Sequence, residues 1–250
     1  MFLVVNFNKE QREIYLTSSN RVSGALYESV DGAARFWNLN KVNDSIAQEN
    51  AVLRKEVDLL RQLVKADPNI DTTNAPPGFT YIPAKVLNNS IDKHNNSFTI
   101  NRGKKHGVES GMGVLSENGV VGIVRSTGNN YATVMSILHK QSRISAELKR
   151  YGFFGFMTWP IDDPTMAIMV DVPKHAPVAI GDTIVTSGYS YKFPQGLMLG
   201  VVDTFFIQPG SNFYTIDVSL SVDMSSIKYV YVADEKEFAE VKKLEEEADE

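Results

Sequence analysis

Residues 118–124 read Asn-Gly-Val-Val-Gly-Ile-Val, and this stretch decides the fold class of the chain. Asn-Gly between valine- and leucine-rich runs is the strongest short signal for a β-hairpin, because a type I′ turn needs positive φ at both central residues. We therefore expect Gly113–Leu115 and Val120–Val124 to pair as antiparallel strands around a type I′ turn.

Similar short runs rich in β-branched and aromatic residues continue from Phe79 to Val232, with turn signals between them. Many short strands at this spacing are typical of barrels or sandwiches. Between Phe79 and Val232, only Ser142 to Arg150 hints at a helix. The other expected strands are 84–87, 97–100, 132–135, 153–159, 166–172, 183–186, 197–202, 214–220 and 229–232.

The hairpin unit occurs twice in the chain. Gly111-Met112-Gly113-Val114 leads to residues 118–124, and Gly181-Asp182-Thr183-Ile184-Val185 leads to residues 196–202. In each unit a glycine turn opens one strand, and the next strand carries a glycine two positions before a valine. The sequence therefore predicts two small six-stranded β-barrels, each using this unit once, although glycine turns in β proteins often look alike.

Before the strands, residues 9–66 read as helix, with strict heptads over 36–64. Leucine at d with β-branched residues at a favours a parallel two-stranded coiled coil, and asparagine at a fixes its register. The fold class is thus mainly β with an N-terminal α-helical coiled coil. The expected dimerisation residues are Phe36, Asn43, Asn50, Val57 and Val64 at a, and Leu39, Ile46, Leu53 and Leu60 at d.

The flanking charges agree with a parallel dimer. Glu49 and Glu56 lie at g positions and Arg54 and Arg61 at the following e positions. Each exposed g-to-e′ pair is worth only about 0.2–1 kcal/mol, so the pairs select orientation. The alternative is a single amphipathic helix that lies on its own domain, but such a helix usually has a wider apolar stripe.

These patterns divide the chain into segments. Pro68 ends the helix, and residues 67–78 form a Pro- and Asn-rich linker. We expect a first barrel over 79–145, which shares strands with the C-terminal part in one interpretation, and a second barrel over 146–232. The acidic tail 233–250 is either a short helix or a solvated end. Residues 1–8 are either a plain apolar start or the remnant of a membrane helix and its flank.

Composition and motifs argue against several kinds of chemistry. The chain has 250 residues, a net charge of −5, and no cysteine, which excludes disulfides and thiolate metal sites. No basic stripe indicates nucleic-acid binding, no glycine loop matches a phosphate-binding motif, and no histidine has metal-ligand spacing. We expect no catalytic, cofactor or metal site.

The second glycine unit carries a family resemblance. Residues 181–188 read GDTIVTSG, followed by Phe193-Pro194-Gln195-Gly196 and Gly200-Val201-Val202. This resembles the signature of the MreC family of rod shape-determining proteins, although Tyr189 to Lys192 replaces a more glycine-rich link. The motif residues are Gly181, Asp182, Thr186, Ser187, Gly188, Phe193, Pro194, Gly196 and Gly200.

The resemblance implies a non-enzymatic scaffold of the bacterial cell-wall elongation complex that organises peptidoglycan synthases. It implies a single-pass inner-membrane protein, anchored by an N-terminal helix missing here, with its bulk in the periplasm. It further implies a homodimer, with filaments in some members. The implied partners are a class B penicillin-binding transpeptidase, MreD, a SEDS glycosyltransferase and MreB.

Two aromatic clusters are candidates for partner binding, since aromatic residues are enriched at interface hot spots. One contains Tyr189, Tyr191 and Phe193, and the other contains Phe153, Phe154 and Phe156, with Trp159 and Pro160. Aromatic residues also fill barrel cores, and for both clusters the core interpretation is favoured.

Two other functions remain as alternatives. A periplasmic adaptor of an efflux or secretion system also joins coils to barrels, but it uses a helical hairpin between its β halves. A double-barrel serine hydrolase needs a Ser-His-Asp arrangement. Ser187 is its best nucleophile, and no histidine lies in a context suited to a base.

Overall fold

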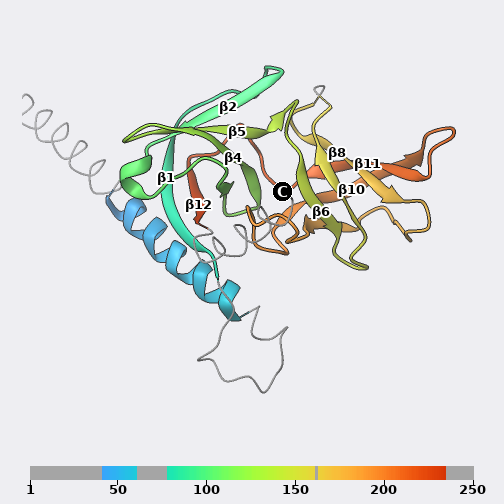
Figure 1. Cartoon of the computed structure of the whole chain (residues 1–250), viewed down its shortest axis with the longest axis horizontal. Helices are drawn as coiled ribbons and strands as arrows, with labels where there is room; N and C mark the ends of the chain where they lie inside the picture. Colours follow the sequence, from blue (N-terminus) through green and yellow to red (C-terminus); the bar gives the residue numbers. More distant parts are fainter. Residues whose placement is uncertain (1–40, 61–77, 161–162, 235–250) are drawn as a thin grey trace, which may run out of the picture. The chain divides into compact units, whose positions relative to one another are not determined.

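The computed structural model describes residues 41–60, 78–160 and 163–234. Within them, residues 41–60 are helical, and strands make up most of the rest (Figure 1). The strands are β1 (Thr80–Asn89), β2 (Asn95–Ile100), β3 (Gly113–Leu115), β4 (Val120–Thr127), β5 (Ala132–His139), β6 (Ile144–Leu148), β7 (Phe154–Thr158), β8 (Met166–Pro173), β9 (Thr183–Thr186), β10 (Met198–Ile207), β11 (Phe213–Leu220) and β12 (Tyr229–Asp234), with a 3₁₀ turn η2 (Lys104–His106) after β2.

These strands form two closed six-stranded antiparallel barrels, which confirms the predicted fold class. The first has the order β1-β12-β3-β4-β5-β2, and the second has the order β10-β11-β8-β7-β6-β9. Closure pairs every strand on both sides, so a barrel buries apolar side chains without leaving a free sheet edge. Phe98 and Ile100 lie in the interior of the first barrel, and Met169, Ile184 and Ile216 lie in that of the second.

The C-terminal strand β12 belongs to the first barrel, where it pairs with β1 and β3. Figure 1 shows it beside β1. The sequence predicts a second barrel over 146–232, which includes residues 229–232, whereas the structure places these residues in the first barrel. Strand sharing with the C-terminal part, which the sequence left open, is the arrangement observed. The second barrel is continuous in sequence from β6 to β11, and it is inserted between β5 and β12 of the first.

The glycine units occupy equivalent places in the two barrels. Gly111 donates its N–H to the carbonyl of Val124, and Val124 donates back to Met112, at 2.8 Å each. Gly181 and Val202 repeat this pair of bonds in the second barrel, with Asp182 in place of Met112, at 2.9 Å each. The structure therefore confirms the predicted repeat.

Two local predictions were wrong. The helix hinted at by Ser142 to Arg150 is strand β6, whose side chains alternate between buried and half-buried. The β3–β4 hairpin is present, but its turn is not type I′, because the only described non-glycine residue with positive φ is Asp171. Instead, Asn118 donates its N–H to the Ser116 hydroxyl, and Ser116 donates its N–H to the Gly119 carbonyl.

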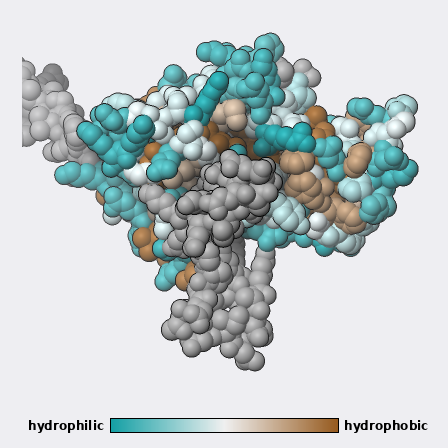
Figure 2. All heavy atoms as spheres, viewed as in Figure 1, coloured by the Kyte–Doolittle hydropathy of each residue, from teal (hydrophilic) through white to brown (hydrophobic). Residues whose placement is uncertain are grey.

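The two barrels share one hydrophobic cluster of buried side chains. The contact is made in part by Phe193, which precedes β10 and packs its ring against Gly113 at the start of β3. Figure 2 shows that hydrophilic residues predominate on the visible face of the described chain and that hydrophobic ones form small separate areas. Candidate docking surfaces therefore have to be argued from individual residues.

Candidate docking surfaces

One face of helical residues 48–60 is exposed to solvent. Of the predicted seam, Asn50, Leu53, Val57 and Leu60 are exposed, and Leu53 and Leu60 keep 48% and 57% of their surface. These four residues recur at intervals of three and four, so they form a single stripe. Asn43 and Ile46 are exposed as well, whereas Phe36, Leu39 and Val64 lie outside the described residues.

A different face of residues 48–60 packs on the first barrel. Ala51 joins a cluster with Phe79, Tyr81, Leu115, Tyr231 and Ala233. The Arg54 guanidinium lies over the Tyr231 ring, 4.7 Å from its centroid, and the Tyr81 hydroxyl donates to the Asp58 carboxylate. The heptad analysis missed this face, because Arg54 and Asp58 are polar and a small Ala51 gives no periodic signal.

The Thr-Ser-Gly motif closes a tight loop with the Phe-Pro-Gln-Gly segment. Thr186 is buried, and its hydroxyl donates to the Pro194 carbonyl at 2.6 Å and accepts the Leu197 N–H at 2.9 Å. The Gly196 N–H donates to the Thr186 carbonyl. These bonds hold the loop so that Phe193 points into the contact between the barrels, where it keeps only 3% of its surface.

The remaining motif residues also shape the backbone. Gly181, Gly188 and Gly196 have positive φ, and Asp182 accepts the Ala179 N–H at 2.9 Å. A Cβ at Gly200 would collide with the carbonyl of Ser219 on β11, just as one at Gly122 would collide with Met135 on β5. The motif therefore builds the fold of the second barrel and its contact with the first.

A row of aromatic side chains crosses the outside of the second barrel. Tyr189 packs edge-to-face on Phe154, with centroids 5.4 Å apart, and Phe154 packs edge-to-face on Phe156 at 4.8 Å. The Arg143 guanidinium lies 3.8 Å over the Phe156 ring and pairs with Asp171 at 2.9 Å. Tyr189 keeps 76% of its surface exposed, so this row presents an aromatic surface to solvent. We call these five residues the aromatic row.

The structure divides the predicted partner-binding residues. Tyr189 and Phe154 lie in the aromatic row, whereas Phe193 is buried between the barrels. Phe153 packs against the core and on the His175 ring at 5.5 Å. Tyr191 is half-buried. Phe156, which the sequence placed in the same aromatic stretch as Phe154, lies in the row. Arg143 was not singled out from the sequence, because strand pairing rather than local spacing brings it to the Phe156 ring.

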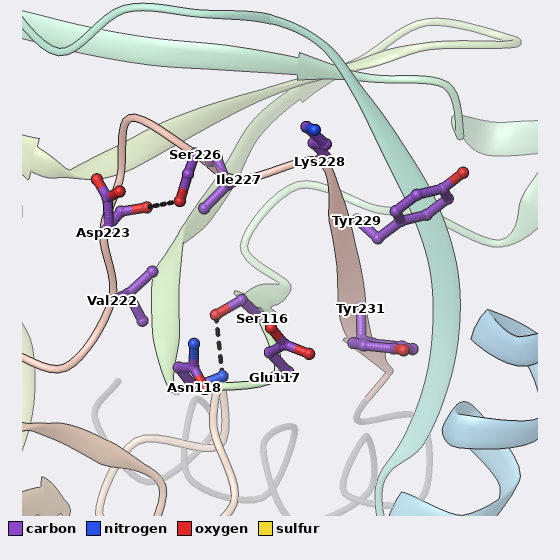
Figure 3. A pocket seen from close by; sticks show the side chains of 10 residues that line it. All are labelled: Ser116, Glu117, Asn118, Val222, Asp223, Ser226, Ile227, Lys228, Tyr229 and Tyr231. Carbon is purple, nitrogen blue, oxygen red and sulfur yellow. Dashed lines mark hydrogen bonds between the residues drawn. The ribbon is translucent and has the colours of Figure 1, made fainter. Parts of the chain in front are cut away.

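A shallow pocket of about 280 Å³ lies between the β3–β4 turn, the loop before β12, and β12 itself (Figure 3). Hydrogen bonds from the hydroxyl and N–H of Ser225 hold the pKa of Asp223 below its usual value. The Ser116 hydroxyl is engaged with the turn. Asp223 and the Ser116 hydroxyl thus stabilise loops. None of the ten residues that line the pocket is a histidine, so the pocket has no Ser-His pair.

The candidate hydrolase residues do not form a catalytic arrangement among the described residues. Ser187 is buried, and its hydroxyl accepts the Tyr189 N–H at 3.4 Å. The buried His139 accepts the Gln141 N–H at Nδ1, and burial lowers the pKa of its imidazole, with Arg125 and Lys140 adding to the effect. No hydrogen bond joins Ser187 to a histidine in the described chain. Among the same residues, no group of three or more acidic or histidine side chains could hold a metal ion.

In the part of the chain that the structure describes, the helix of residues 41–60 precedes every strand, which also separates this architecture from adaptors with a helical hairpin between β halves. No helix within the described ranges is long and apolar enough to cross a membrane.

Comparison with known proteins agrees with this architecture. The family model described as "Rod shape-determining protein MreC, barrel core" matches residues 86–234, which run from β1 through β12. The chain belongs to the MreC family. Its members are non-enzymatic cell shape-determining proteins.

Curated MreC proteins are similar over most of this chain. The cell shape-determining protein MreC of Listeria monocytogenes is 27% identical over 214 residues, which cover 78% of this chain and 71% of that protein. MreC of Escherichia coli is 22% identical over 218 residues, which cover 84% of this chain and 59% of that protein. The chain thus spans only part of the length of these MreC proteins.

Solved MreC structures share the fold. The Listeria MreC structure has a TM-score of 0.63 at 22% identity, and the match covers 79% of this chain and 94% of that one. MreC in the solved complex with penicillin-binding protein PBP2 from Helicobacter pylori has a TM-score of 0.53 at 19% identity, and the match covers 63% of this chain and 99% of that one.

Proposed function

We propose that this MreC family member is a scaffold of the bacterial cell-wall elongation complex, which organises peptidoglycan synthases as a parallel dimer. The observation that carries the proposal is the exposed stripe of Asn50, Leu53, Val57 and Leu60 on a helix whose other face is occupied by the barrel. An a/d stripe with asparagine at a and leucine at d suits a second copy of the same helix.

The proposed partner at the second barrel is a class B penicillin-binding transpeptidase. The Helicobacter MreC forms a complex with PBP2, and the aromatic row has the residue types that are enriched at interface hot spots. MreD, a SEDS glycosyltransferase and MreB complete the set of partners proposed from the resemblance.

We place the barrels outside the cytoplasmic membrane, with a single anchoring helix ahead of the coil. A related solved structure is the major periplasmic domain of the cell shape-determining filament MreC. That description also supports filament formation as a proposed property of dimers of this chain.

Sedimentation equilibrium tests the dimer. Leu53→Glu with Leu60→Glu places like charges in the seam, so we expect a monomer where the unmodified chain is a dimer. Asn43→Ile with Asn50→Ile removes the asparagine pairs that fix the register of the coil, so several oligomeric states should form. Val52→Glu, an exposed residue outside the stripe, is the control and should remain dimeric. A monomeric unmodified chain at high concentration would refute the coiled coil.

Binding to the purified periplasmic part of a class B transpeptidase tests the aromatic row. Phe154→Ser with Tyr189→Ser should weaken binding about tenfold or more, because hot-spot aromatics supply a large share of binding free energy. Tyr131→Ser, an exposed tyrosine on the first barrel, should leave the affinity unchanged. Equal binding by all three proteins, measured by biolayer interferometry, would remove the row from the proposal.

A further inference from the structure

We propose that Arg54 couples the docking of the helix on the first barrel to dimerisation, so that each contact strengthens the other. This inference rests on the proposed parallel coil. It goes beyond that coil by linking the e-position residue Arg54 to Tyr231 of the barrel, and by making the barrel part of the dimer's stability.

The helix has two separate contact faces. In an α-helix successive residues are about 100° apart. The docked face of Ala51, Arg54 and Asp58 therefore lies roughly a third of a turn from the exposed stripe of Asn50, Leu53, Val57 and Leu60. A second helix on the stripe leaves the docked face in place, so both contacts form at once.

Arg54 lies at the border between these faces. It is half-buried, and its guanidinium lies on the ring of Tyr231, a residue that is itself almost fully buried. A guanidinium stacked on an aromatic ring keeps its in-plane N–H groups for other acceptors. Arg54 can therefore contact the barrel and donate hydrogen bonds to a carboxylate at the same time.

In a parallel in-register pair that carboxylate comes from the other copy. Arg54 occupies an e position, and Glu49 of the partner subunit occupies the preceding g position, which faces it across the seam. Glu49 is exposed in the described chain. The opposite charges of these two positions supply the complementarity that assigns a second copy, rather than another partner, to this edge of the helix.

The coupling follows from the ordering of one side chain. A free arginine loses rotamer freedom when it forms an ion pair, whereas an arginine already stacked on Tyr231 has lost part of that freedom. Barrel docking therefore favours the pair with Glu49 of the partner subunit. By reciprocity, the pair favours docking of the helix on the barrel.

The experiment measures the dimer dissociation constant of the full chain by sedimentation equilibrium. Tyr231→Leu keeps an apolar side chain but removes the aromatic face, and we expect the dimer to weaken about two- to fivefold, because Arg54 then loses its rotamer freedom only when it pairs with Glu49 of the partner subunit. Tyr229→Leu is the matched control, because Tyr229 lies two residues away on the same strand. It should leave the constant unchanged.

A double-mutant cycle tests whether the effect passes through Arg54. Glu49→Gln should weaken the dimer, and its effect should shrink in the Tyr231→Leu background, since the two changes act on one side chain. Arg54→Lys keeps the charge at a half-exposed position but loses the planar stacking. It should reproduce the weakening even if Tyr231→Leu perturbs the barrel.

The outcomes separate the two proposals. A dimer with the same dissociation constant in Tyr231→Leu and Arg54→Lys would overturn the coupling and leave the scaffold standing. Additive effects in the cycle would overturn it as well. An unmodified chain that stays monomeric would overturn both.

Discussion

Gly113 shows how a single residue sets the contact between the two barrels. A Cβ at this position would meet the Lys192 carbonyl and lie 2.5 Å from the Phe193 ring. The obstacle includes backbone, which cannot turn away as the end of a flexible side chain can. The first barrel therefore accepts the Phe193 ring of the second only because position 113 has no side chain.

Gly113→Ala should destabilise the chain by about 1–3 kcal/mol, the usual cost of overpacking. Urea unfolding measures the change. Gly128→Ala is the control, since its Cβ would meet only the Tyr131 carbonyl, at 3.4 Å, and should cost much less. Equal stability of the two variants would show that the barrels adjust their contact freely.

At the scale of an element, the loop from Thr186 to Leu197 depends on one buried hydroxyl. Thr186 Oγ1 satisfies the Pro194 carbonyl and the Leu197 N–H together. Thr186→Val keeps the shape but leaves both backbone groups without this partner, so we expect a loss of about 1–3 kcal/mol.

The matched control for this loop is Thr183→Val on the same strand β9. Thr183 is half-buried, and its side chain makes no hydrogen bond within the described residues, so the change should stay within about 0.5 kcal/mol. Both variants are compared by thermal unfolding. A Thr186→Val protein as stable as Thr183→Val would show that the hydroxyl does not hold the loop.

At the scale of the whole molecule, β12 closes the first barrel after the chain has built the second. Removing residues 229–250 takes away the strand between β1 and β3, and each of these strands then exposes an unpaired edge. We expect loss of amide exchange protection in residues 80–139, while residues 144–220, which contain every strand of the second barrel, remain protected.

Removing only residues 235–250 is the control for that truncation, because β12 ends at Asp234. Both barrels should keep their protection, as measured by hydrogen exchange with mass spectrometry. Protection that persists in residues 80–139 of the longer truncation would mean that the first barrel closes without β12.

Local patterns determined much of this protein. Alternating apolar residues predicted most strands, because strand burial has a period of two that neighbouring residues encode. The glycine units predicted the repeated hairpin, since close backbone approach excludes a side chain at particular positions. The heptads predicted a stripe on the helix, and the described part of that stripe is exposed.

Only the tertiary structure decided the rest, because those features depend on partners distant in the chain. The place of β12 follows from its pairing with β1, in which Thr80 lies opposite Asp234, 154 residues further along the chain. Phe193 is buried and Tyr189 exposed although both are aromatic residues of one loop. Phe193 packs against Gly113 of the first barrel, and Tyr189 packs on Phe154 of strand β7. No local period in the sequence encodes these contacts.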